Sequence, residues 1–116
     1  MYYLDIISLE NCQYSNAALD LAKNKQIKYN KISVTEKNKQ LYKTQEQTTY
    51  PQIYLKKNNR EGSLLIGGYD SLKEITDLLY GKQLNNNDII FTMNKYNISK
   101  KAVLRLYQLI NKSFLF

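Results

Sequence analysis

Cys12 is the side chain best able to act as a nucleophile, because the sequence has one cysteine and no histidine. It lies between a segment typical of a strand and one typical of a helix. Free N–H groups and the dipole at a helix start stabilise a thiolate, the reactive form of cysteine. A small buried hydrophobic residue is the alternative role. The polar neighbours Asn11 and Gln13 favour the exposed, reactive thiol.

Ser15 completes a short motif with this cysteine. The segment Cys12-Gln13-Tyr14-Ser15 has the spacing of a C-x-x-C redox motif, with a hydroxyl in place of the second sulfur. A serine cannot resolve a mixed disulfide. Its hydroxyl could donate a hydrogen bond to the thiolate or cap the turn, and both roles stay open.

Two other segments could bind a ligand. The only proline, Pro51, follows Tyr50 directly before a predicted strand. A cis bond there would present the Tyr50 backbone to an extended peptide, whereas a trans proline would simply open the strand. The segment Gly67-Gly68-Tyr69-Asp70 follows another strand. Its N–H groups could hold a carboxylate at a helix start, or it could be a plain turn.

The predicted elements that position these groups alternate in type. Apolar, β-branched runs predict strands at residues 2–7, 27–34, 52–57 and 64–66. Helical spacing of apolar residues, or a polar run behind a cap, predicts helices at residues 13–24, 36–45, 71–80, 88–96 and 100–111. Thr35 and Ser99 are candidate N-caps, Ser71 opens a capping box, and Gly81 suits a helix C′ position.

This order, β-α-β-α-β-β-α, predicts an α/β fold with a four-stranded mixed sheet flanked by helices, plus extra C-terminal helices. The βαβ crossover requires parallel strands, and the hairpin at residues 58–62 adds two antiparallel ones. We expect a sheet domain over residues 1–81 and a basic helical extension over residues 82–116. The extension would be packed on the sheet domain or appended to it.

Length and composition exclude several classes of protein. The 116 residues fit one domain, and 43% hydrophobic with 23% charged residues is typical of a globular protein. No apolar run approaches the ~18 residues of a membrane helix, and the N-terminus lacks the basic start of a secretory signal. One cysteine cannot form an internal disulfide. We therefore expect a cytoplasmic protein without membrane association.

The net charge of +7 is uneven. Residues 1–81 carry 11 − 9 = +2, whereas residues 82–116 carry 6 − 1 = +5. Such a tail can attract nucleic acid or an acidic partner. A solvated helix surface is the simpler explanation, so we expect no nucleic-acid partner. As a separate expectation, the protein is a monomer.

The order of elements and motifs resembles the glutaredoxin family of the thioredoxin fold over residues 1–81. The resemblance depends on the segments Asn11–Ser15, Thr49–Tyr54 and Ile66–Leu72. The C-x-x-S motif is of the monothiol type but differs from the C-G-F-S form associated with iron–sulfur transfer. Leu9 stands where the family commonly has lysine, and Gln13 where it has proline or glycine. Weaker thiolate stabilisation is expected, unless Lys43 or another base substitutes.

The resemblance implies a glutathione-dependent thiol–disulfide oxidoreductase that acts on protein–glutathione mixed disulfides. Cys12 would attack the glutathione sulfur, with Tyr14 flanking the sulfur and Ser15 beside it. Glutathione would be the cofactor, and glutathionylated proteins the partners. The implied glutathione site consists of Gln47 for the glycyl carboxylate, Tyr50 for main-chain bonds, cis Pro51, and Gly68, Tyr69 and Asp70 for the γ-glutamyl end.

Two alternatives remain open. A [2Fe–2S] cluster could bridge two chains, with Cys12 from each and two glutathiones as ligands; no other metal is expected. The protein could also be a non-enzymatic adaptor that keeps the thioredoxin fold as a scaffold and binds its partner through the basic tail.

Overall fold

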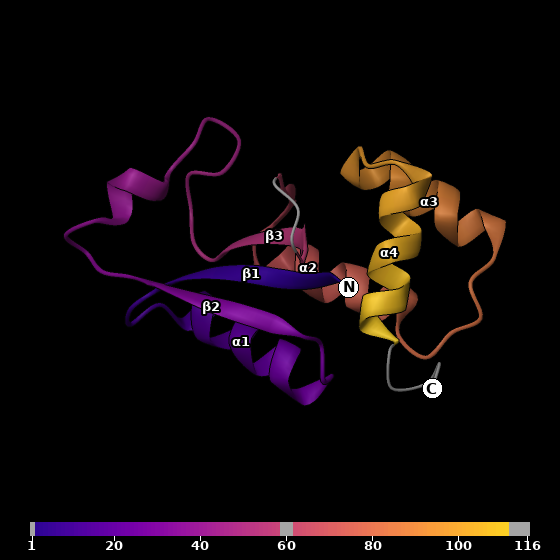
Figure 1. Ribbon diagram of the computed structural model, residues 1–116, viewed down its shortest axis with the longest axis horizontal. Helices are drawn as coiled ribbons and strands as arrows, with labels where there is room; N and C mark the ends of the chain where they lie inside the picture. Colours follow the sequence, from indigo (N-terminus) through magenta and orange to yellow (C-terminus); the bar gives the residue numbers. More distant parts are fainter. Residues whose placement is uncertain (1, 59–61, 112–116) are drawn as a thin grey trace.

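A mixed four-stranded sheet with the order β2-β1-β3-β4 forms the centre of the computed structural model, which describes residues 2–58 and 62–111 (Figure 1). Strand β1 pairs in parallel with β2 and antiparallel with β3, which pairs antiparallel with β4. The strands are β1 (Tyr2–Leu9), β2 (Tyr29–Val34), β3 (Gln52–Lys57) and β4 (Leu64–Gly67). The helices are α1 (Gln13–Asn24), α2 (Tyr69–Leu79), α3 (Asn86–Tyr96) and α4 (Lys100–Ile110). This confirms the predicted mixed sheet with flanking helices, a thioredoxin-like α/β fold.

The two faces of the sheet are covered differently. Side chains alternate along a strand, so Leu4 and Ile6 of β1 enter the main core, whereas Ile7 enters a smaller cluster. The main core also contains the buried faces of α1, α2 and α4. The smaller cluster is built around Val34 and Tyr50, which flank the segment between β2 and β3. That connection therefore supplies the cover of the second face.

The helix predicted over residues 36–45 is wrong. The segment contains only a short 3₁₀ turn, η1 (Lys39–Tyr42). The predicted N-cap Thr35 does not cap a helix. Its backbone N–H instead donates to the Asn38 side-chain oxygen at 2.8 Å, and such local side-chain bonds compete with helix formation. The run also lacks an apolar stripe that a helix could bury, and Leu41 is 82% exposed.

Several predicted boundaries also change. Strand β2 begins at Tyr29 and not at residue 27, because the Ile27 N–H still bonds to the Ala22 carbonyl and closes α1. Helix α2 begins at Tyr69 with Gly68 as its N-cap, so the capping box predicted to start at Ser71 is wrong. Part of the predicted hairpin loop, residues 59–61, lies outside the described residues.

The caps predicted in the last third of the chain are confirmed, although α3 starts two residues earlier than predicted, with Asn85 as its N-cap. The Ser99 side chain accepts a hydrogen bond from the Ala102 N–H and caps α4. Gly81 follows α2 with φ of +68°, the left-handed conformation of a C′ residue. None of the helices in the described ranges is long and apolar enough to cross a bilayer.

The C-terminal helices share the core of the sheet domain. Val103, Leu106 and Ile110 of α4 are almost fully buried in the same cluster as Leu4 of β1 and Leu72 of α2. Figure 1 shows α4 beside the start of β1, with α3 on its far side. The helices are therefore packed on the sheet domain and not free of it.

Polar contacts also join the C-terminal helices to α2. The Asn111 side chain accepts from the Gly81 N–H at 2.6 Å and donates to the Leu79 carbonyl at 2.9 Å, so it caps the end of α2. On α3, the Tyr96 hydroxyl donates to the Glu74 carboxylate. Burial, together with that carboxylate, raises the pKa of Tyr96.

We predict that Asn111→Ala lowers the free energy of unfolding by about 3 kcal/mol, because the buried Leu79 carbonyl and the partly buried Gly81 N–H lose their partner. Urea denaturation followed by circular dichroism measures this change. Gln108→Ala, on the exposed side of α4, is the matched control and should change stability by less than about 0.5 kcal/mol. Equal effects of the two substitutions would contradict the capping role.

Candidate active site

Cys12 lies at the junction between β1 and α1. It is the N-cap residue of α1, with φ −102° and ψ 118°, and it follows a left-handed turn at Asn11 with φ of +58°. Its side chain is partly exposed and forms no disulfide. The position places the sulfur beside the N–H groups of the first helical turn, which have no partner within the helix.

Ser15 supports the sulfur from inside the protein. It is fully buried, and its hydroxyl oxygen accepts a hydrogen bond from the Leu9 N–H at 3.1 Å. Burial raises the pKa of the Cys12 thiol, but hydrogen bonds from the Ser15 N–H, the Ser15 hydroxyl and the Tyr14 N–H outweigh it. The net effect is a pKa below the ordinary value for cysteine. The serine hydroxyl therefore contacts the thiolate and also joins the end of β1 to α1.

Leu9 brings no positive charge to the Cys12 thiolate, unlike the lysine that the family commonly has at this position. It is partly buried and packs against the small cluster of Ile7, Val34 and Tyr50. The groups that lower the pKa of Cys12 are neutral donors of the first turn of α1, and not Lys43. Hydrogen bonding thus takes over from the absent lysine charge.

Tyr50 approaches the sulfur from the other side. The Tyr50–Pro51 peptide bond is cis, which is the isomer that the family resemblance implies and one of the two left open by the sequence. The Tyr50 carbonyl oxygen lies 4.0 Å from the Cys12 sulfur. Burial, followed by the nearby Tyr42, raises the pKa of the Tyr50 hydroxyl, which donates to the Lys39 carbonyl.

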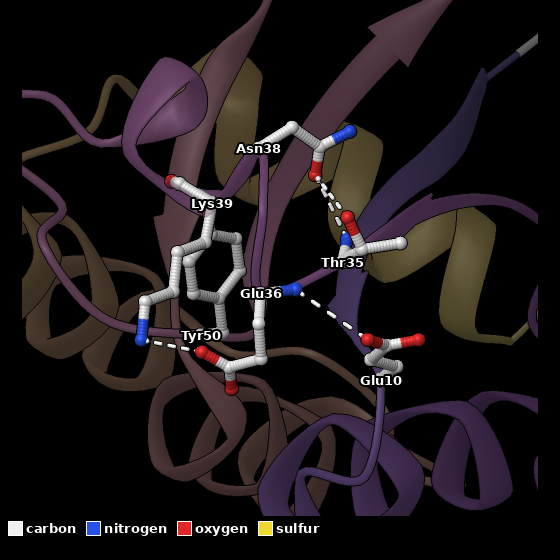
Figure 2. A network of polar contacts seen from close by, with 6 residues as sticks. All are labelled: Glu10, Thr35, Glu36, Asn38, Lys39 and Tyr50. Carbon is white, nitrogen blue, oxygen red and sulfur yellow. Dashed lines mark hydrogen bonds and ion pairs between the residues drawn. The ribbon is translucent and has the colours of Figure 1, made fainter.

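A network of polar contacts connects this tyrosine to the segment that replaces the expected helix (Figure 2). Lys39 forms an ion pair with Glu36 at 2.7 Å. The Glu36 N–H donates to the Glu10 carboxylate, two residues before Cys12, at 3.5 Å. The connection between β2 and β3 is therefore hydrogen-bonded both to Glu10, at the end of β1, and to the hydroxyl of Tyr50.

A groove of about 440 Å³ is lined by Tyr50, whose carbonyl lies next to the Cys12 sulfur, although Cys12 itself is not among the lining residues. The side chains of Tyr14 and Tyr69 line this groove, and the centroids of their rings are 6.5 Å apart. Gly68, which has no side chain, caps α2, so the first N–H groups of that helix have no side-chain cap. The residues that line the groove are Tyr14, Gln47, Thr49, Tyr50, Gly68, Tyr69, Asp70 and Ser71.

Gln47 is held at the rim of this groove by its own hydrogen bonds. Its side-chain nitrogen donates to the Thr49 carbonyl at 3.3 Å and to the Pro51 carbonyl at 3.5 Å. The amide therefore sits close to the cis bond, and a carboxylate arriving in the groove would compete for its N–H groups.

The structure brings together most of the side chains that the sequence singled out. Ser15 and Tyr50 meet at Cys12, while the other predicted residues except Pro51 line the groove. Pro51 is buried and is not among the lining residues, and its carbonyl accepts a hydrogen bond from the Gln47 side chain. Sequence reasoning missed Thr49 and Ser71 as lining residues, although both belong to the motifs around Pro51 and Gly68.

Gln52 was also missed. It is completely buried directly after Pro51, and its side-chain oxygen has no hydrogen-bond partner among the described residues. Its side-chain nitrogen donates to the Gln47 carbonyl. No sequence pattern distinguishes it from an ordinary strand residue. Within the described ranges, no three histidine, cysteine, aspartate or glutamate side chains gather as a metal site would require.

A cysteine at the start of the first helix of a thioredoxin-like sheet, facing a cis-proline turn, defines the thiol-active class of this fold. The comparison with protein families agrees, since residues 4–59 match the model described as Glutaredoxin. No curated protein matches the chain. Over these residues the chain is similar to the glutaredoxin family, whose general activity is thiol–disulfide oxidoreduction. Members of the family generally use glutathione.

We predict that Ser15→Ala raises the pKa of the Cys12 thiol, because the buried hydroxyl no longer donates to the thiolate. The pH dependence of iodoacetamide alkylation measures this pKa. Gln13→Ala changes an exposed residue in the same turn and should leave the pKa unchanged. If both variants titrate like the wild type, the hydroxyl does not stabilise the thiolate.

Proposed function

We propose that the protein is a glutathione-dependent oxidoreductase that reduces protein–glutathione mixed disulfides through Cys12 alone. The observation that carries the proposal is the position of a thiol with a lowered pKa next to the Tyr50 carbonyl and the groove. The family match supports the type of reaction.

The proposed reaction has two exchanges. The Cys12 thiolate attacks the glutathione sulfur of the mixed disulfide, so that a Cys12–glutathione bond forms and the bond to the substrate protein breaks. The substrate thiolate leaves and takes up a proton from solvent. A second glutathione thiolate then attacks the glutathione sulfur on Cys12, which releases oxidised glutathione and restores the Cys12 thiolate. One protein sulfur is sufficient, and Ser15 stabilises it without taking part in exchange.

The groove offers matching contacts for a tripeptide with carboxylates at both ends. The N–H groups of Tyr69 and Asp70 open α2, where a helix start favours an anion, and they would hold the γ-glutamyl carboxylate. The Asp70 carboxylate would face the γ-glutamyl ammonium. At the other end, the Gln47 amide would hold the glycyl carboxylate. The main chain at Tyr50 would pair with the cysteinyl part between them.

The setting of the reaction belongs to the same proposal. A thiolate that must stay reduced suits the cytoplasm, where glutathione is available. We propose that a monomer carries out the reaction, because a single chain supplies all the groove residues.

The two alternatives lead to different experiments. A [2Fe–2S] cluster shared by two chains predicts a coloured, glutathione-dependent dimer after anaerobic reconstitution, and loss of both colour and dimer in Cys12→Ser. An adaptor predicts a salt-sensitive partner that survives Cys12→Ser. Because α4 is part of the core, the adaptor is tested by exchanging exposed charges such as Lys100, and not by deleting the tail.

We predict that Cys12→Ser abolishes the reduction of a glutathionylated peptide, whereas the wild type turns it over. Because the pKa of Cys12 is lowered, the wild-type rate should rise with pH and level off below the pH at which an ordinary thiol would. A coupled assay that follows oxidised glutathione measures both effects. A wild type no faster than the serine variant would overturn the proposal.

Gly68→Ala tests the groove without disturbing the fold. A Cβ there would lie 3.6 Å from the Pro51 carbonyl oxygen and 3.8 Å from the Gln47 amide nitrogen, which is ordinary contact. We predict unchanged stability but a roughly ten-fold higher KM for the glutathionylated peptide, because the methyl group takes up space in the site.

Gly67→Ala provides the contrasting substitution. Gly67 has φ of +126°, and a Cβ would lie 2.7 Å from the Ser71 hydroxyl oxygen, so this variant should be destabilised. Steady-state kinetics and thermal unfolding of both variants separate the two effects. An unchanged KM in Gly68→Ala would show that glutathione binds elsewhere.

A further inference from the structure

A second cavity lies at the opposite end of the sheet from Cys12. It also measures about 440 Å³, and its lining includes Tyr2 at the start of β1 and Lys57 at the end of β3, which are paired in the sheet. Cys12 follows the other end of β1. The seven steps from Tyr2 to Leu9 cover about 23 Å at ~3.3 Å per residue. The two cavities are therefore separate sites.

The charged residues that the structure describes in the lining of this cavity are all positive. Among the described residues that line it, three are the cations Lys56, Lys57 and Arg105, and none is acidic. Lys56 pairs with the buried Asp5 at 3.4 Å. In the described part of the chain, neither Lys57 nor Arg105 pairs with a carboxylate. Among the residues that the structure describes, two positive charges thus face a concave space without a carboxylate partner.

Tyr2 holds these two cations in place. The Arg105 guanidinium carbon lies 5.1 Å, and the Lys57 ammonium nitrogen 5.6 Å, from the centre of its ring. The negative face of an aromatic ring attracts cations and so offsets part of their mutual repulsion. It does not neutralise them. A hollow lined by one sign of charge concentrates the potential and attracts an ion of the opposite sign.

We propose that this cavity binds a small molecule with two or more linked phosphates. The planar guanidinium of Arg105 can donate two parallel hydrogen bonds to one phosphate, and the Lys57 ammonium can neutralise the next. The volume is within the range of small-molecule sites, roughly 300–1,000 Å³, and exceeds what a single phosphate would fill. The glutathione groove differs, because no lysine or arginine lines it and Asp70 does.

The proposal gives the basic C-terminal extension a chemical role. Arg105 comes from α4, whereas Lys56 and Lys57 come from β3, so the site exists only because α4 packs against the sheet domain. A ligand there would bridge the two parts and would favour the docked arrangement of α4.

Isothermal titration calorimetry of the full chain at constant ionic strength tests the proposal with sodium pyrophosphate and with ATP. We expect saturable binding at one site per chain. Equal affinities would assign the contacts to the phosphates alone and support an inorganic or variable source, whereas tighter binding of ATP would support a nucleotide. Absence of saturable binding by both ligands would overturn the proposal.

Substitutions locate the binding. Arg105→Gln should weaken pyrophosphate binding at least ten-fold, because it removes a bidentate contact. Lys101→Gln removes the same charge from an exposed position of the same helix outside the cavity lining, and should change binding less than two-fold. Ser63→Asp places a carboxylate in the lining without removing a contact of Tyr2, and should abolish binding in a folded protein.

Two further outcomes would overturn the proposed phosphate site. Equal losses in Arg105→Gln and Lys101→Gln would mean diffuse attraction to a basic surface and would overturn the site. Tighter binding of a short single-stranded oligonucleotide, lost in Ser63→Asp, would assign the surface to nucleic acid and also overturn it. Cys12→Ser should bind pyrophosphate like the wild type, so this test is independent of the proposed oxidoreductase activity.

Discussion

The antiparallel pairing of β1 with β3 is the constraint on which the active site depends. Ile7 pairs with Gln52, so the chain leaves β1 toward Cys12 at the same end of the sheet where Pro51 leads into β3. Strand β4 runs antiparallel to β3, with Gly67 opposite Ile53, and this brings Gly68 to that end as well. A slip of one residue would turn every side chain of β1 to the other face and separate the three segments.

This convergence explains how a thiol without a neighbouring lysine has a lowered pKa. The end of β1 and the start of α1 are joined by the bond between the Leu9 N–H and the Ser15 hydroxyl, which fixes the first turn under the sulfur. The N–H donors of that turn act at short range in a partly buried place, where a hydrogen bond to a charged atom is strong. Leu9 meanwhile packs in the small apolar cluster and helps to cover the second face of the sheet.

The second face of the sheet is covered without an α-helix. Between β2 and β3 the chain forms an extended connection with one 3₁₀ turn. Its fastening depends on Tyr50, whose main chain approaches the sulfur while its hydroxyl holds the Lys39 carbonyl (Figure 2). One residue thus serves both the site and the cover of the sheet. At the other end, α3 and α4 enlarge the main core and bring Arg105 beside β3.

Local pattern was enough to predict the helix at α1, the strand at β3, the cap at Ser99 and the three motifs that meet at the site. These depend on the spacing of apolar residues, on serine as a cap and on the restricted backbone of proline, all of which act over a few residues. Partners distant in sequence decide three other features: the absence of an α-helix over residues 36–45, the start of α2, and the burial of Gln52. The tertiary structure also decides that Tyr50 lies close to Cys12 and that Arg105 lies close to Lys57. Sheet register and helix docking set these distances, because none of these residues are neighbours in the sequence.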